Sequence, residues 1–347
     1  MRYKLLGNSG IRVSEVCLGT MSFGDVWGFG ADEQESGRII SAFADAGGNF
    51  LDTANKYHEG QSEQIVGKHI EGDRDRWVVA TKYTLSMRGD DPNASGNSRK
   101  NMTRSVEGSL RRLGTDYIDL LWVHAWDFTT PVEEVMRGLD DLVRAGKVLY
   151  LGISDAPAWV VSRANTIAEL RGWTPFVAQQ MQYSLLERTI EREALPMADA
   201  FGMATTAWAP LAAGVLTGKH TRGGGKPDTK RSNDDRLNEH NLSIARVVDE
   251  IADQLDRSSA QVAVNWVRQR GDKLIPIVGA RKVEQIQDVL TCLDFRLDEA
   301  HMAKLNDVSR IELGFPREFL GADAIRNIVY GDLAAQIDLP PGAQKPR

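Results

Sequence analysis

Eight short apolar segments alternate with amphipathic helical patterns along the chain, and this alternation limits the fold more than any other feature. Strands that are apolar on both faces and are separated by helices require a parallel sheet covered by helices. Eight such units predict a closed (β/α)8 barrel of the α/β class. An open sheet would more naturally carry GxGxxG after its first strand, where this chain has GTMSFGDVWGFG. The predicted strands are residues 15–20, 49–53, 77–82, 118–124, 148–154, 176–182, 204–210 and 274–280.

The helical segments carry their own start and stop signals. The pattern over 98–114 ends on Gly114, which suits a helix C-terminus. The pattern over 130–147 begins with Thr130 and Pro131, which suit an N-cap followed by the first helical turn. The remaining predicted helices are 32–47, 156–171, 192–201, 241–255, 259–270 and 282–290, with an extra helix at 297–310.

Both ends of the chain lie outside the repeat. The segment YKLLGNSGIRVS predicts a β-hairpin that turns at Asn8–Ser9–Gly10 and plugs the bottom of the barrel. Residues 311–347 end in DLPPGAQKPR, and we expect an irregular C-terminal tail there. Because no linker interrupts the pattern, we expect a single domain over 1–347.

Composition and charge exclude several classes of function. With 42 Lys and Arg against 48 Asp and Glu, the net charge of −6 gives no general reason to bind nucleic acid or an anionic membrane. The one basic cluster, 222–236, is interrupted by acids and is interpreted as a solvated loop. Cys17 and Cys292 are too few for a disulfide framework or a zinc site and are expected to be buried. With no signal-like or membrane-spanning segment, the sequence predicts a soluble, cytoplasmic protein with no metal.

Ionisable side chains stand at the ends of three consecutive predicted strands. Asp52 ends one strand and Tyr57 follows in its loop, Lys82 ends the next strand, and His124 ends the third. In a (β/α)8 barrel these ends meet at one mouth, where active sites lie. Each residue alone also fits a turn, a solvated surface or a core position, but together they form a workable acid catalyst.

The chemistry of such a set follows from the charge on the lysine. A phenol ordinarily has a pKa near 10, too high for efficient proton donation at neutral pH, and a nearby cation lowers it. Lys82 can be that cation, it stays charged more easily if Asp52 pairs with it, and His124 can then orient a substrate oxygen. The residues can protonate a carbonyl oxygen but hold no hydride, so an organic cofactor must supply one.

Over roughly residues 3–310 the chain resembles the aldo-keto reductase family, in particular its aryl-alcohol dehydrogenase and potassium-channel β-subunit-like branch. FLDTANKYHEGQSE resembles the family's Asp-Thr-Ala…Tyr-Gly-x-Ser-Glu motif, and VVATK and DLLWVHAWD resemble its lysine and histidine strands. The resemblance implies a TIM barrel and a catalytic tetrad of Asp52, Tyr57, Lys82 and His124, with Tyr57 as general acid.

The resemblance also implies an NADP(H) site. GISD and QQMQYSLLER are similar to segments that hold the nicotinamide carboxamide, AWAPLAAGVLTGK to an aromatic stacking residue and pyrophosphate loop, and IPIVGARKVEQ to the adenosine site. An arginine near a 2′-phosphate favours NADPH over NADH. The implied cofactor contacts are Gly19, Thr20, Met21, Asp52, Ser154, Asp155, Gln180, Trp208, Pro210, Leu211, Gly214, Leu216, Gly218, Lys219, Gly279, Arg281 and Gln285.

Four positions depart from the family pattern. His58 stands where the motif commonly has glycine, and Asp155 and Gln179 replace asparagines. Val289 replaces an asparagine near adenine, which puts that contact in doubt. None of the four belongs to the tetrad, and no role is assigned to His58.

The resulting prediction is an NADP(H)-dependent oxidoreductase that reduces an aldehyde or ketone, with an aryl or otherwise apolar substrate favoured. The long polar loop 217–240 is expected to fold over bound cofactor. A cofactor-sensing binding protein with little turnover, and an alcohol or sugar dehydrogenase working in the reverse direction, remain alternatives. The sequence leaves the natural substrate and the oligomeric state open. The predicted substrate pocket comprises Met21, Phe23, Trp27, Tyr57, His124, Trp126 and the tail.

Overall fold

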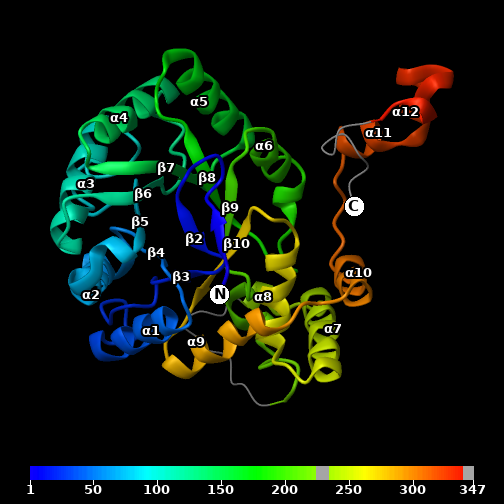
Figure 1. Cartoon of the computed structure of the whole chain (residues 1–347), viewed down its shortest axis with the longest axis horizontal. Helices are drawn as coiled ribbons and strands as arrows, with labels where there is room; N and C mark the ends of the chain where they lie inside the picture. Colours follow the sequence, from blue (N-terminus) through cyan, green and yellow to red (C-terminus); the bar gives the residue numbers. More distant parts are fainter. Residues whose placement is uncertain (224–233, 339–347) are drawn as a thin grey trace.

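A closed barrel of eight parallel strands forms the centre of the molecule (Figure 1). This computed structural model describes residues 1–223 and 234–338. The strands follow one another around the barrel in chain order, and β10 closes it against β3. All eight predicted strands are confirmed. They are β3 (Cys17–Gly19), β4 (Phe50–Asp52), β5 (Val78–Tyr83), β6 (Ile118–Val123), β7 (Val148–Ser154), β8 (Phe176–Gln182), β9 (Ala204–Trp208) and β10 (Leu274–Gly279).

Alternation of side chains along the strands decides which residues point into the barrel. In β4, Phe50 belongs to the interior cluster and Leu51 to the cluster that faces the helices. The next inward position is therefore Asp52. In β5, Ala80 lies inside, which places Lys82 inside as well. The C-terminal ends of β4 and β5 thus each carry an inward-facing charged residue above an apolar barrel interior.

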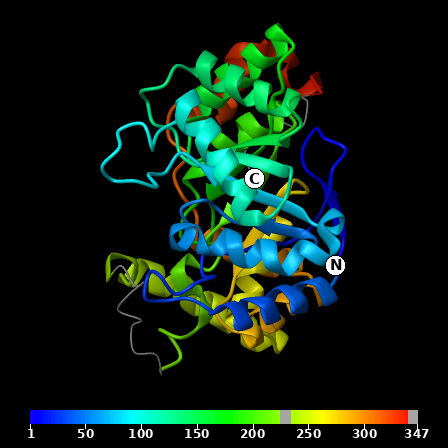
Figure 2. The same cartoon turned by 90° about the vertical axis from the view of Figure 1, so that its left-hand side faces the viewer.

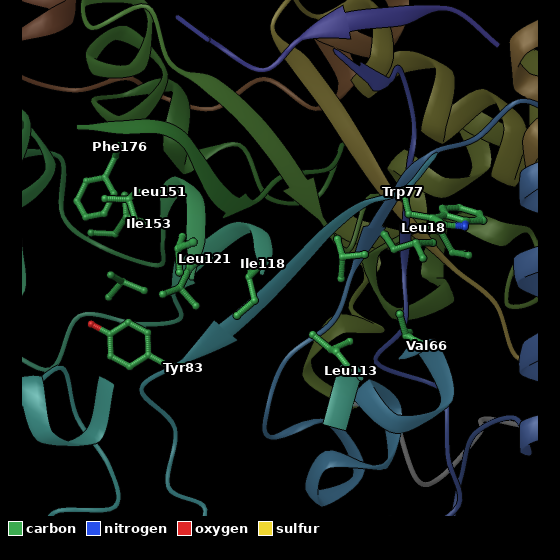
Figure 3. Packing of buried hydrophobic residues seen from close by; sticks show 14 of the residues in the cluster. Leu18, Val66, Trp77, Tyr83, Leu113, Ile118, Leu121, Leu151, Ile153 and Phe176 are labelled. Atoms are coloured by element: carbon green, nitrogen blue, oxygen red, sulfur yellow. The ribbon is translucent and has the colours of Figure 1, made fainter. Parts of the chain in front are cut away.

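A ring of helices covers the outer face of the barrel (Figure 1). Figure 3 shows part of this packing, in which Leu121 and Leu151 lie on neighbouring strands and Val66 and Leu113 on helices. The predicted helices are confirmed, and the structure adds α2, whose apolar face carries residues spaced three and four apart. The ring comprises α1 (Glu33–Asp45), α2 (Gln61–Ile70), α3 (Arg99–Leu113), α4 (Val132–Arg144), α5 (Ala158–Arg171), α6 (Ala194–Ala200), α7 (Glu239–Leu255), α8 (Ser259–Gln269) and α9 (Val283–Leu290).

The start of α4 differs from the sequence prediction. Pro131 is the cap, with φ −58° and ψ 139°, and the helix begins at Val132 instead of using Thr130 as its N-cap. The reason is Asp127, whose carboxylate accepts hydrogen bonds from the backbone N–H groups of Thr129 and Thr130 and from the Thr130 hydroxyl. This Asx-type turn holds the residues before Pro131 outside the helix.

The N-terminal hairpin closes one end of the barrel, as predicted. Strand β1 (Tyr3–Leu5) pairs antiparallel with β2 (Arg12–Ser14). Leu6 and Val13 are fully buried in the interior cluster, and Lys4 donates to the carbonyl of the first residue of β10 (2.8 Å). Figure 2 shows this hairpin (dark blue) on one side of the barrel and the cyan loop after β5 on the opposite side.

The C-terminal segment is more ordered than the predicted irregular tail. After the expected extra helix α10 (Glu299–Val308), two short helices, α11 (Arg317–Gly321) and α12 (Asp323–Tyr330), stand away from the barrel (Figure 1). In α12 the apolar residues recur at helical spacing, whereas the prolines and glycine that suggested irregularity come later, in residues 339–347, outside the described part of the chain. In the described residues no helix is long and apolar enough to cross a membrane.

Candidate active site

Lys82 is the centre of the site, because its ammonium group holds three partners at once. Its Nζ donates to Asp52 Oδ2 (2.5 Å), to the Thr53 carbonyl (3.0 Å) and to Tyr57 Oη (3.0 Å), which uses all three of its donors. The side chain is 1% exposed. Burial lowers the pKa of Lys82, but the Asp52 carboxylate and Tyr57 outweigh burial and raise the pKa above its ordinary value. The lysine is therefore charged at neutral pH.

Tyr57 reaches the lysine from the loop after β4. Its ring also lies under the ammonium, with Lys82 Nζ 4.7 Å from the ring centroid. Burial raises the pKa of the phenol, and the Lys82 charge lowers it by a smaller amount. The sequence predicted the effect of the lysine but not the larger effect of burial, so the net direction is the opposite of the one expected. At neutral pH the phenol carries its proton.

His124 completes the mouth of the barrel at the end of β6. Its ring packs edge-on against Tyr57, with centroids 6.0 Å apart. Burial and, to a smaller extent, the Lys82 charge lower the pKa of His124 to about 3. The imidazole is therefore neutral, and within the described residues its buried Nδ1 has no hydrogen-bond partner. A neutral ring can donate one N–H to a substrate oxygen without competing for the proton of Tyr57.

Residues outside the predicted set hold the lysine strand in place. Glu63 is fully buried in α2 and accepts from the Thr81 hydroxyl (2.5 Å) and from Arg112 Nε (2.6 Å). Ser62, beside it, lies 2.9 Å from the hydroxyl of Thr20. These two residues are the Ser-Glu end of the quoted FLDTANKYHEGQSE motif, which was the available signal for their role.

The residues expected around the nicotinamide carboxamide lie together beside Asp52. Gln180 Nε2 donates to Asp52 Oδ1 (2.9 Å), and Ser154 is the neighbour of Gln180 across β7 and β8. Asp155 has a left-handed backbone, with φ 44°, and accepts from the indole N–H of Trp208 (3.1 Å). Burial raises the pKa of Asp155, only partly offset by the Trp208 hydrogen bond.

The loop after β9 turns tightly and carries several left-handed residues. Ala212, Ala213 and Gly214 have consecutive positive φ values of 48°, 55° and 95°, and Gly218 follows with 81°. The backbone N–H groups of Ala212 and Gly214 donate to the carbonyls of Ala209 (2.9 Å) and Leu211 (2.8 Å), so the loop folds as a series of tight turns. A Cβ added at Gly214 would lie 2.9 Å from Lys219 Nζ, so the ammonium folds back over this backbone. Of the other residues predicted for this loop, Leu211 is partly buried and Pro210 and Leu216 are buried.

Two further predicted cofactor segments flank the barrel mouth. Gln285 Oε1 accepts from the backbone N–H of Arg281 (2.9 Å), which brings these two residues together at the start of α9. Gly279 ends β10 beside Gly19 of β3. Next to them, Met21 is 42% exposed, whereas Thr20 is fully buried and its hydroxyl donates to the Asp52 carbonyl (3.1 Å).

The predicted substrate-facing residues divide into two groups. Trp27 lies edge-on to Tyr57, with centroids 6.4 Å apart. Trp126 is partly buried, and its backbone N–H donates to the Asp155 carbonyl (3.4 Å). The prediction that Phe23 lines the pocket is corrected. Its side chain is fully buried in the cluster between strands and helices, because the loop turns it inward. Through residues 1–223 and 234–338, no cluster of three or more His, Cys, Asp or Glu residues could hold a metal ion.

Comparison with known proteins finds a family model that matches most of the chain. Residues 15–310 match the model of the "Aldo/keto reductase family". The chain is 40% identical to an aryl-alcohol dehydrogenase [NADP(+)] of Phanerodontia chrysosporium, over 94% of this chain and 90% of that protein. It is 39% identical to a norsolorinic acid reductase of Aspergillus flavus, over 91% and 83% of the two chains. It is 36% identical to the aldo-keto reductase ausK of Emericella nidulans, over 96% and 88%.

Proposed function

The chain belongs to the aldo/keto reductase family, a family of oxidoreductases, and from this premise we propose that Tyr57 is the proton donor in an NADP(H)-dependent reduction of an aldehyde or ketone. The observation that carries the proposal is the buried chain of contacts from Asp52 through Lys82 to Tyr57 Oη. The reverse reaction, oxidation of an alcohol, uses the same groups with Tyr57 as the base.

Each of the four residues has a separate task in the proposed reaction. Tyr57 keeps its proton until the carbonyl oxygen gains negative charge, because burial raises its pKa. Lys82 then stabilises the phenolate that the transfer leaves behind, since its Nζ already lies 3.0 Å from the phenol oxygen. Asp52 balances the lysine charge, and the neutral His124 donates to the substrate oxygen and holds it near Tyr57.

The residues at the barrel mouth fit a dinucleotide cofactor. NADPH, when bound, supplies the hydride. The Lys219 ammonium beside Gly214 suits a pyrophosphate, and Arg281 suits a 2′-phosphate. Ser154 and Asp155 lie where a carboxamide can bond, and Trp208 offers an aromatic face. The Phanerodontia chrysosporium relative carries NADP(+) in its name, which supports the same cofactor for this chain.

The aromatic side chains beside Tyr57 indicate the class of substrate. Trp27 presents a flat apolar surface beside Tyr57, and such a surface stacks on aromatic rings. A relative named for aryl alcohols is among the most similar proteins. We therefore propose aryl aldehydes or aryl ketones as substrates.

The proposal is tested by following NADPH oxidation with a panel of aromatic and aliphatic aldehydes. Tyr57→Phe should lower kcat by roughly 10²- to 10⁴-fold, because the proton donor is lost, while the Kd for NADPH changes little. Tyr117→Phe is the matched control, since Tyr117 donates to Asp75 on the outside of the barrel and should keep full activity.

Two outcomes would contradict the proposal. Full activity of Tyr57→Phe would remove Tyr57 as the proton donor. Tight NADPH binding by the wild-type protein without turnover of any carbonyl compound or alcohol would favour a cofactor-sensing binding protein.

A further inference from the structure

His58, the residue after Tyr57, occupies a backbone conformation that ordinary side chains avoid. Its φ and ψ are 48° and 41°, and those of Glu59 are 56° and 33°. Each left-handed residue of this kind costs roughly 1 kcal/mol relative to glycine. His58 is nevertheless fully buried. Such a cost persists where the side chain makes contacts that glycine cannot make.

Contacts of the His58 side chain reach three residues of the loop between β3 and α1. Its Nδ1 accepts from the backbone N–H of Trp27 (3.3 Å), and its ring stacks on the Trp27 indole, with centroids 4.6 Å apart and planes 24° apart. The Phe29 ring packs edge-on against the imidazole at 5.6 Å. Gly24, with φ 123°, lies so close that an added Cβ would be 2.8 Å from His58 Cγ.

The Trp27 indole thus packs against both the His58 ring and the ring of the catalytic phenol. The indole lies edge-on to Tyr57, with planes 78° apart, and its N–H donates to Glu59 Oε1 (3.3 Å). The two left-handed residues therefore act together, because His58 supports one face of the indole and Glu59 holds its edge. We call these contacts of His58 and Glu59 with the indole the clamp. Because Trp27 lies in no helix or strand, the clamp sets its position relative to the proton donor.

We propose that His58 is a positioning residue that fixes the Trp27 wall of the substrate pocket and thereby favours planar aromatic carbonyl compounds. This inference rests on the proposed reductase function. His58 acts through Trp27 and takes no part in proton transfer, since its Nδ1 accepts a backbone hydrogen bond and its ring faces Trp27 and Phe29. Small aliphatic aldehydes do not reach the indole, so the clamp makes no difference to them.

Three variants separate the two contacts of the imidazole with Trp27, which are the hydrogen bond to its backbone N–H and the ring stacking. His58→Gly removes both and relieves the backbone, His58→Asn keeps an acceptor for the Trp27 N–H, and His58→Phe keeps the stacking surface. For His58→Gly we expect KM for an aromatic aldehyde such as benzaldehyde to rise by about tenfold, the size of one lost aromatic contact. We expect kcat, KM for propanal and Kd for NADPH to change by less than about twofold. His58→Phe should retain most of the affinity for benzaldehyde, and His58→Asn part of it.

A double-mutant cycle with Trp27→Ala shows whether His58 acts through the indole. If it does, Trp27→Ala and the double variant have the same KM for benzaldehyde, because the second change removes nothing more. Amide hydrogen exchange over residues 20–31 gives a readout independent of activity, and exchange there should be faster in His58→Gly than in the wild type.

Several outcomes would overturn the inference. They are an equal rise in KM for benzaldehyde and propanal, a loss of kcat with both substrates, additive effects in the cycle, or unchanged exchange in the loop. If His58→Gly does not fold, the Asn and Phe variants give the same comparison. Failure of the reductase function is distinguished by the wild-type protein, which would then turn over neither aldehyde.

Discussion

Each end of the barrel carries a buried ion pair, and the two pairs have different functions. At the hairpin end, Arg268 Nη1 contacts Glu15 Oε2 (2.9 Å), and its other N–H groups donate to Asn265 and to the carbonyls of Cys292 and Phe295. Each nitrogen of that guanidinium donates to a fixed protein acceptor. At the open end, the corresponding network runs from Asp52 through Lys82 to a phenol whose proton can leave.

The backbone shows the same contrast. Of the nine described non-glycine residues with positive φ, all but Asp256 lie in loops that follow the C-terminal ends of barrel strands, among them His58, Thr84 and Asp155. At the hairpin, the left-handed position is taken by Gly7. Backbone strain therefore gathers at the end where substrate and cofactor are proposed to bind, while the closed end is built without it.

Lys82→Met should have the largest effect, because it breaks the network at the open end. We expect kcat for carbonyl reduction to fall by roughly 10³-fold, since nothing then stabilises the phenolate of Tyr57. The variant should also be less stable by about 3–5 kcal/mol, because Asp52 is left buried without its partner. Steady-state kinetics and urea unfolding measure the two effects.

The double variant Asp52→Asn/Lys82→Met separates stability from chemistry. It should regain much of the free energy of unfolding, as no charge is buried alone, but none of the lost kcat. Recovery of kcat together with stability would show that the pair at the open end is structural, like the one at the hairpin.

Arg268→Met is the counterpart at the closed end. Removing the guanidinium leaves Glu15 buried and should lower the free energy of unfolding by about 3–5 kcal/mol. In contrast to Lys82→Met, kcat and KM measured on the folded variant at low temperature should equal those of the wild type. A large loss of kcat would mean that the two ends are coupled through the barrel.

A smaller effect concerns pH and His124. Its folded pKa of about 3 lies below the ordinary value of 6.5, so in this window the unfolded chain binds a proton that the folded chain does not. Stability therefore falls as pH drops below about 6.5, with a limiting slope of about 1.4 kcal/mol per pH unit. Because the ring is partly exposed, we expect roughly 1 kcal/mol between pH 7 and pH 5.

His124→Asn isolates that contribution, since the other titrating groups are common to both proteins. Urea unfolding at pH 7 and pH 5 should show a smaller loss of stability in the variant than in the wild type. An identical loss in both would mean that the imidazole is already protonated in the folded protein at pH 5.

Asp155→Asn should have the smallest effect. Asparagine tolerates the left-handed backbone at this position, and its side-chain oxygen still accepts from Trp208. The added NH2 can also donate to a carboxamide oxygen, so the Kd for NADPH should stay the same or fall by up to about fivefold. Fluorescence titration with NADPH measures this, and a weaker affinity would place the carboxylate itself in contact with the cofactor.

Parts of the site could be predicted from the sequence because successive side chains along a strand alternate between its two faces. Once the apolar runs are read as parallel strands, Asp52, Lys82 and His124 must stand at the same mouth of the barrel. The loops follow no such rule. Phe23 was expected in the pocket with Trp27, yet it is fully buried while Trp27 lies beside Tyr57, because packing against other loops decides where each side chain points.

The sequence alone determined the (β/α)8 barrel, its eight strands and the order of the ionisable residues around its mouth, because periodicity and strand alternation are local properties. Only the tertiary structure decided the proton affinities and the shape of the pocket. The pKa of Tyr57 depends on burial against the Lys82 charge, and both are set by contacts between segments far apart in the chain. The role of His58 depends likewise on Trp27, 31 residues away in the sequence.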